Sequence, residues 1–181
     1  MARPFTLIKR TTLYEGKVIQ LIREVLDVNG QRVLRETVKH PGAVVIVPLL
    51  DASHMVFVRQ YRRAIDRNLL ELPAGTLGAG ESRLACAKRE LEEETGWRAG
   101  RMRRLVQFFA APGFISEQMT LFLAQDLTRV GAHPEPDEIV TPVILTIRQA
   151  LAKIRSGAIC DAKTIIGVLF VSRLEANREF V

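Results

Sequence analysis

Cysteine and long apolar runs are both scarce in this chain of 181 residues. The two cysteines, Cys86 and Cys160, are too few for a disulfide framework or a four-ligand zinc site, and we expect both to be buried thiols in a reducing cytoplasm. The longest apolar stretch, Ala43 to Leu50, is far shorter than the roughly 20 residues that a membrane-spanning helix requires. The charged first nine residues lack the apolar core of a secretory signal. These absences predict a cytoplasmic protein without a membrane segment.

Aromatic residues are also few, at 6% of the chain, and no strand is rich enough in them to stack the bases of a single-stranded nucleic acid. The chain is nevertheless basic, because 26 lysines and arginines outnumber 20 acidic residues and give a net charge of +6. The basic residues are scattered, without a run of five or more like charges. This balance fits a polyphosphate ligand as well as a nucleic acid, and we do not expect a nucleic-acid partner.

The order of apolar and turn-forming residues predicts a mixed fold in which strands surround one central helix and more helix follows at the end. Strands are expected at 5–9, 17–28, 32–39, 42–50, 55–61, 102–109, 118–125 and 139–145, and helices at 82–95, 147–156 and 162–176. Asn29-Gly30 indicates a two-residue hairpin turn. Gly96 should end the first helix, and Thr146 and Asp161 should cap the other two. Because strands and helices do not alternate regularly, the predicted class is α+β.

Three glutamates in the central helix are the first sign of chemistry. Each helical residue advances by about 100°, so Glu90, Glu93 and Glu94 share one face, and Arg89 lies one turn before Glu93 and can orient it. Three like charges so close together destabilise the helix unless something neutralises them, and Mg²⁺, a hard cation that takes oxygen ligands, would do so. A solvated acidic helix face is the alternative interpretation of these glutamates taken alone.

The other side chains of this helix have expected places too. Glu92 points away from the acidic face, where Lys88 can pair with it. Leu84, Ala87 and Leu91 form an apolar stripe that should pack on the sheet.

The glutamates belong to a longer pattern. From Gly75, through Glu81 and the run Arg89 to Glu94, to Trp97, the sequence fits G-x5-E-x7-R-E-U-x-E-E-x-G-U, where U is a bulky apolar residue. This pattern resembles the signature of the Nudix hydrolase family. The resemblance implies a loop-helix-loop that binds divalent metal, within an α/β/α sandwich that has a mixed sheet. The implied reaction is hydrolysis of a nucleoside diphosphate linked to another group.

Flanking segments are similar to the ADP-ribose pyrophosphatase branch of that family. They are Tyr14-Glu15-Gly16, Arg35-Glu36, His40-Pro41-Gly42, Arg59 to Arg62, Glu71 to Gly75, Pro112 in the run Ala111 to Glu117, and Ser156 to Thr164. The branch implies magnesium-dependent hydrolysis of ADP-ribose, or a related ADP-sugar, to AMP and ribose 5-phosphate. Another nucleoside diphosphate sugar such as GDP-mannose is an alternative substrate. A non-catalytic ADP-ribose sensor is a second alternative, although a pure binder does not need the three glutamates.

The resemblance also implies roles for particular residues. The main-chain carbonyl of Ala74 and the carboxylates of Glu90 and Glu94 would hold two or three Mg²⁺ ions, or Mn²⁺ or Zn²⁺ in their place. Glu93 would complete the metal site directly or through water, and Arg89 would belong to the catalytic group.

Substrate contacts are implied for Arg62, for Arg35 and Glu36 in the N-terminal hairpin, and for Pro112 and Gly113. In this branch the residue that corresponds to Arg35 often comes from the partner subunit. An acidic residue of the polar loop at 128–137 or just after it would support the attacking water, and the candidates are Glu135, Asp137 and Glu138. We favour Glu138 slightly over Glu135 because it lies nearest the following strand. The domain division implied is an N-terminal strand region at 1–40, expected to form a homodimer, and a Nudix domain at 41–181.

Overall fold

The computed structural model describes residues 5–133 and 139–176, and the chain divides into two compact units. Among the described residues, the first unit comprises 5–42 and 108–118, and the second unit comprises 43–107, 119–133 and 139–176. Residues 108–118 therefore group with the N-terminal strands, which the sequence did not indicate. No helix in the described ranges has both the length and the apolar character that crossing a bilayer requires.

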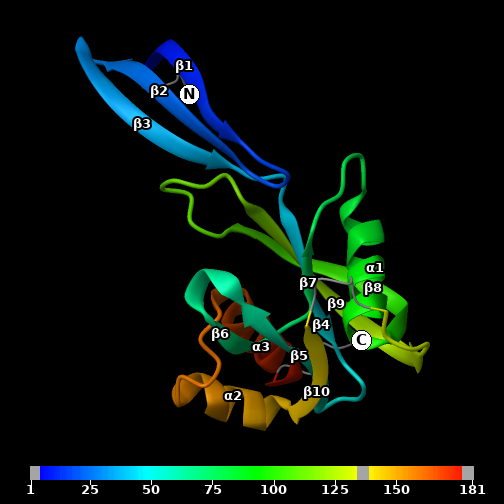
Figure 1. Cartoon of the computed structure of the whole chain (residues 1–181). Helices are drawn as coiled ribbons and strands as arrows, with labels where there is room; N and C mark the ends of the chain where they lie inside the picture. The colour runs from blue at the N-terminus through cyan, green and yellow to red at the C-terminus, as the bar shows by residue number, and fades with distance from the viewer. Residues whose placement is uncertain (1–4, 134–138, 177–181) are drawn as a thin grey trace. The chain divides into compact units, whose positions relative to one another are not determined.

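The first unit is an antiparallel three-stranded sheet in the order β1-β2-β3 (Figure 1). Its strands are β1 (Thr6–Glu15), β2 (Gln20–Val28) and β3 (Gln31–Lys39). The predicted hairpin is confirmed, because Asn29 and Gly30 have φ angles of 55° and 83°, which the two-residue turn requires. β1 continues beyond the predicted end at Lys9. All its residues are exposed, so no alternation of buried positions marks its length in the sequence.

Two sheets, with strand orders β7-β4-β9-β8 and β10-β5-β6, make up the second unit, except that 108–109 at the end of β8 and 118 at the start of β9 belong to the first unit. The first sheet consists of β7 (Ala74–Thr76), β4 (Ala43–Pro48), β9 (Gln118–Arg129) and β8 (Trp97–Phe109), and the second of β10 (Val140–Thr146), β5 (His54–Arg62) and β6 (Arg67–Glu71). β4 runs parallel to β9 and antiparallel to β7, so the predicted mixed sheet is confirmed. β9 also extends to Arg129, which shortens the loop predicted from residue 128. β6 and β7 were not predicted, because five-residue and three-residue strands carry too little periodicity.

Three α-helices and one short 3₁₀ helix complete the second unit. They are η1 (Arg63–Ile65), α1 (Arg83–Thr95), α2 (Ile147–Arg155) and α3 (Ala162–Ala176). The predicted caps are confirmed: Thr146 forms a capping box with Gln149, and Asp161 Oδ2 accepts a hydrogen bond from Thr164 N at 3.0 Å.

β4 lies between two helices, which makes this part of the unit a sandwich (Figure 1). All six β4 residues are buried, because successive side chains of a strand point to opposite faces and both faces are covered. Val44 and Ile46 pack with Cys86, Ala87 and Leu91 of α1. Val47, on the other face, lies against Gly167 of α3.

Two expectations about burial are wrong. Leu84 is 43% exposed, because the buried face of α1 runs through positions 86, 87, 90, 91 and 94 and leaves Leu84 at its border. Cys160 is exposed rather than buried, although both thiols are free as expected.

Gly167 allows α3 to approach the sheet. A Cβ at this position would stand 2.4 Å from Leu72 Cδ1 and 3.3 Å from Val47 Cγ2, and both of these side chains are fully buried. We expect Gly167→Ala to lower the free energy of unfolding, since overpacking costs about 1–3 kcal/mol. Alanine is a better helix residue than glycine by about 1 kcal/mol, so the overpacking costs that much more than the net loss.

Urea denaturation checks this prediction. Gly113→Ala is the control, because a Cβ there would meet nothing within 4 Å. A Gly167→Ala protein more stable than the wild type would contradict the close contact.

Candidate active site

Helix α1 is fixed at both ends. Ser82 accepts a hydrogen bond from Ala85 N at its start, and Gly96 ends it with a φ of 73°, as predicted. Gly96 is required for a second reason, because a Cβ on it would stand 2.6 Å from Ala132 N. The main-chain N–H of His133 donates to Glu93 O at 3.1 Å. The last turn of the helix is therefore tied to the segment that follows β9.

Glu90 and Glu94 lie on the buried face of α1, with 8% and 2% of their surface exposed. Both carboxylates meet the main chain of β7. Glu94 Oε2 accepts a hydrogen bond from Ala74 N at 3.0 Å, and a Cβ on Gly75 would stand only 1.8 Å from Glu90 Oε1. Glycine at position 75 thus leaves the space that the Glu90 carboxylate occupies.

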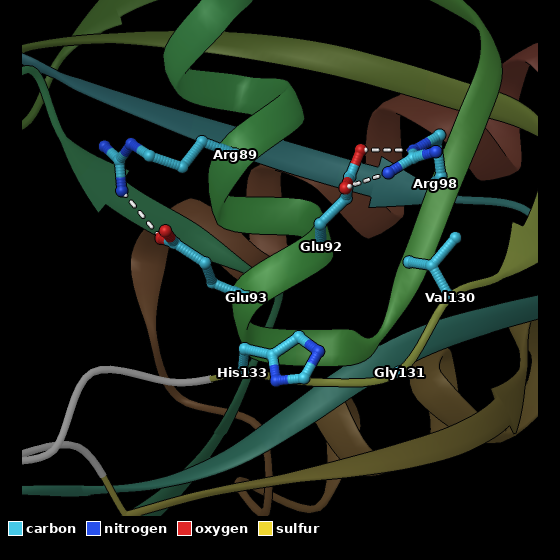
Figure 2. Close-up of a pocket in the computed structure, with 7 residues that line it drawn as sticks. All are labelled: Arg89, Glu92, Glu93, Arg98, Val130, Gly131 and His133. Atoms are coloured by element: carbon cyan, nitrogen blue, oxygen red, sulfur yellow. Dashed lines mark hydrogen bonds and ion pairs between the residues drawn. The ribbon is translucent and has the colours of Figure 1, made fainter.

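Arg89 connects the remaining carboxylates of the motif. Its Nη1 atom lies 2.8 Å from Glu90 Oε1 and 2.8 Å from Glu93 Oε2, and its Nε donates to Glu81 Oε1 at 3.0 Å. The predicted orientation of Glu93 by Arg89 is confirmed, and Figure 2 shows this contact. Hydrogen bonds from Arg89 lower the pKa of Glu81 to about 2, and the carboxylates in turn raise the pKa of Arg89.

A cavity of about 340 Å³ lies beside the last turns of α1 (Figure 2). It is lined by Arg89, Glu92, Glu93, Arg98, Val130, Gly131 and His133. Glu92 accepts hydrogen bonds from Nε and Nη2 of Arg98 at 2.8 and 2.9 Å, and these bonds, together with the charges of Arg98 and the expected partner Lys88, lower the pKa of Glu92. The cavity thus carries charges of both signs next to Glu93.

Arg62 is held by a buried acid that the sequence analysis did not assign a role. Its Nε and Nη2 donate to the two carboxylate oxygens of Glu71, each at 2.7 Å. Burial opposes ionisation of Glu71, but the Arg62 hydrogen bonds and the Lys163 charge outweigh it, so the pKa of Glu71 lies below its ordinary value. Burial opposes ionisation of Arg62, but the hydrogen bonds and charge of Glu71 outweigh it, and the Glu94 charge adds to them, so the pKa of Arg62 lies above its ordinary value.

These residues fit a hard divalent cation. Glu94 meets the Ala74 N–H and Glu90 fills the space beside Gly75, so both carboxylates lie at β7, where the Ala74 carbonyl would be a further oxygen ligand. Nowhere in the described ranges do three His, Cys, Asp or Glu side chains gather closely enough to hold an ion by themselves. Magnesium does not need such a cluster, because it binds through one or two carboxylates and completes its shell with water and substrate phosphates.

None of the other predicted residues is among the described residues of the second unit. Arg35, Glu36, Pro112 and Gly113 are exposed residues of the first unit. Glu36 accepts two hydrogen bonds from Arg23, and Arg35 donates to the Leu34 carbonyl. Glu135, Asp137 and Glu138 fall outside the described residues.

The family model described as NUDIX domain matches residues 39–165. The chain therefore belongs to the Nudix hydrolase family, and the resemblance carried by the motif from Gly75 to Trp97 is confirmed.

Individual proteins also match this chain over most of its length. The chain is 38% identical over 172 residues to the methanol dehydrogenase activator of Bacillus methanolicus and 37% identical over 172 residues to the ADP-ribose pyrophosphatase of Bacillus subtilis, with 93% of each sequence covered in both cases. It is 32% identical over 164 residues to the GDP-mannose pyrophosphatase of Citrobacter koseri, covering 86% of this chain and 80% of that protein. The crystal structure of an ADP compounds hydrolase aligns with a TM-score of 0.87 at 23% identity, over 100% of this chain and 99% of the other, which confirms the predicted fold.

The Glu81–Arg89 contact predicts a pH dependence of stability. Because the pKa of Glu81 falls from 4.5 to about 2 on folding, its ionised form stabilises the fold above pH 4.5, and this contribution is lost as the pH falls toward 2. We expect Glu81→Gln to lower the free energy of unfolding most near neutral pH and progressively less toward pH 2. Urea denaturation across this range measures the effect, and parallel curves for the two proteins would contradict it.

Proposed function

We propose that this chain hydrolyses the pyrophosphate of ADP-ribose, or of a related ADP-sugar, to AMP and ribose 5-phosphate. The observation that carries the proposal is the pair of buried carboxylates, Glu90 and Glu94, held against the main chain of Ala74 and Gly75. A sensor without catalysis would not need two acids in so costly a position. The free thiols of Cys86 and Cys160 support a cytoplasmic setting.

The relatives favour an ADP-linked substrate. Proteins named ADP-ribose pyrophosphatase match this chain at 37–38% identity, whereas those named GDP-mannose pyrophosphatase match at 31–32% and over less of the chain. GDP-mannose therefore remains the second candidate substrate.

Mg²⁺ is the proposed metal, with two or three ions per site and Mn²⁺ or Zn²⁺ as alternatives. The Glu90 and Glu94 carboxylates and the Ala74 carbonyl would hold it, and Glu93, oriented by Arg89, would complete the site directly or through water. When bound, the metal would neutralise charge on the diphosphate and make water more acidic.

Arg62 would bind the diphosphate. Glu71 accepts from its Nε and Nη2 atoms, which leaves Nη1 available to a phosphate oxygen, and the Arg62 side chain is 37% exposed although Glu71 is buried. A guanidinium held by one buried acid is already ordered, so less conformational entropy is lost when substrate binds.

The remaining roles rest on the family resemblance. Glu138, with Glu135 as the alternative, would accept a proton from the attacking water. Arg35, Glu36, Pro112 and Gly113 would contact the rest of the substrate, with Arg35 supplied by the partner subunit.

A substrate panel tests the proposed activity. The protein is incubated with Mg²⁺ and ADP-ribose, another ADP-sugar or GDP-mannose, and the products are separated by chromatography. AMP and ribose 5-phosphate from ADP-ribose, at the highest kcat/KM of the panel, are expected. If GDP-mannose gives the highest kcat/KM, GDP-mannose is the substrate instead of ADP-ribose. If no compound is hydrolysed, the proposed enzymatic activity is refuted.

Loss of one buried carboxylate tests the site itself. Glu94→Gln should lower kcat by several orders of magnitude, because it removes a metal ligand while the amide keeps the side-chain volume. Glu92→Gln is the matched control, since Glu92 is paired with Arg98 on another side of the same helix. Circular dichroism checks that both variants fold. Near-normal turnover by Glu94→Gln at saturating Mg²⁺ would contradict the assignment of Glu94 as a metal ligand.

We also propose a homodimer formed through the first unit. Large apolar side chains gather there with 37–62% of their surface exposed, namely Phe5, Leu7, Ile8, Leu13, Tyr14, Val18, Ile19, Leu34, Phe109 and Phe114. Such a concentration of exposed apolar surface is typical of an interaction site.

Light scattering at micromolar concentration should give the mass of a dimer. Leu34→Asp should shift it toward monomer, whereas Leu169→Asp, at an exposed leucine of the second unit, should not. A fully active wild-type monomer would refute the proposal.

A further inference from the structure

The N-terminus of α3 reaches the strand that leads into the candidate active site. Lys163 Nζ bonds to Glu71 Oε2, the same carboxylate that holds Arg62, and also lies 3.0 Å from Asp161 Oδ2. Glu71 and the Lys163 side chain are 1% and 11% exposed. Two cations thus share the Oε2 atom of one buried carboxylate, and the position of one cation depends on the other.

The neighbouring Thr164 acts on the main chain. Its hydroxyl donates to Asp161 Oδ2 at 2.6 Å and accepts from the Leu72 N–H at 2.8 Å. Thr164 and Leu72 are both fully buried, so no water can replace this hydroxyl, and its loss would leave the Leu72 N–H without a partner.

The segment from Glu71 to Gly75 is consequently held at every residue. Lys163 and Thr164 hold its first two residues, Pro73 O accepts from Ile46 N at 2.9 Å, and Ala74 N donates to Glu94. Gly75 pairs with Val44 in the sheet. One end of the segment is thus fixed by α3 and the other by the buried carboxylates of α1.

We propose that Lys163 and Thr164 are positioning residues for this active site: Thr164 fixes the main chain that presents the Ala74 carbonyl, and Lys163 fixes the Glu71–Arg62 pair. The inference rests on the proposed function, because it assumes that Ala74 helps to hold metal and that Arg62 binds substrate. Neither residue touches the reacting atoms.

The test for Thr164 compares two substitutions. Thr164→Val replaces the hydroxyl by a methyl group of similar size, and Thr164→Ser keeps the hydroxyl but removes the methyl group. The affinity of the full chain for Mn²⁺ is measured without substrate. The electron paramagnetic resonance signal of free Mn²⁺ falls as the ion binds, so this measurement reports on the metal site directly. We expect Thr164→Val to weaken Mn²⁺ binding by about 10-fold or more, as loss of a residue behind a ligand commonly does, and Thr164→Ser to bind as the wild type.

The test for Lys163 separates charge from packing. Lys163→Met should raise KM for the hydrolysed substrate by about 10-fold or more while Mn²⁺ affinity stays near that of the wild type, because Arg62 loses its fixed position but the main chain does not. Lys163→Arg, which keeps the cation, should recover most of the loss.

Val171→Ala is the stability control. It opens a cavity at a fully buried residue of α3, away from the polar contacts. At a similar loss of thermal stability, Thr164→Val must weaken Mn²⁺ binding more than Val171→Ala does, and Lys163→Met must raise KM more than Val171→Ala does. The proposal is overturned if neither variant exceeds this control. A wild type that binds Mn²⁺ but hydrolyses no compound of the panel would refute the proposed function, while the Mn²⁺ comparison would still decide the role of Thr164.

Discussion

The side chains of Glu90 and Glu94 point into the second unit, and buried carboxylates oppose folding unless polar groups meet them. Much of the surrounding structure follows from this constraint. Ala74 offers its N–H to Glu94, and position 75 has no side chain because the Glu90 carboxylate fills that space. The strand that meets these acids must therefore keep a fixed distance from α1, and the packing of β4 between α1 and α3 maintains it.

Charge balance is the second consequence. Arg89 contacts Glu81, Glu90 and Glu93 at once, because a planar guanidinium spreads its five N–H donors over three nitrogens. Arg62 and Lys163 do the same for Glu71 on the other side of the segment. Four acids of this region, Glu71, Glu81, Glu90 and Glu93, thus have defined basic partners that fix the direction of their carboxylates.

Local patterns allowed much of this to be predicted. The turn at Asn29-Gly30, the end of α1 at Gly96 and the contact of Arg89 with Glu93 depend on residues within a few positions of one another, and all three were found. The contacts of Lys163 and Thr164 with Glu71 and Leu72 join residues 92 positions apart, and no spacing rule connects them. The Glu92–Arg98 pair was missed for a related reason, because Arg98 follows the glycine that ends the helix, where helical spacing no longer applies.

Two edge strands affect how the second unit can meet other chains. β7 and β10 each lie at an edge of their sheet, and Pro142 lies within β10. Pro142 removes one N–H from β10, and the three-residue β7 provides few pairing groups. Pro73, just before β7, accepts from Ile46 N, so the N–H that it lacks would have faced β4, whereas the N–H of Ala74 is already taken by Glu94 Oε2. An added strand would therefore find little to bind at β7, because an acid of the candidate active site already occupies the main-chain donor there.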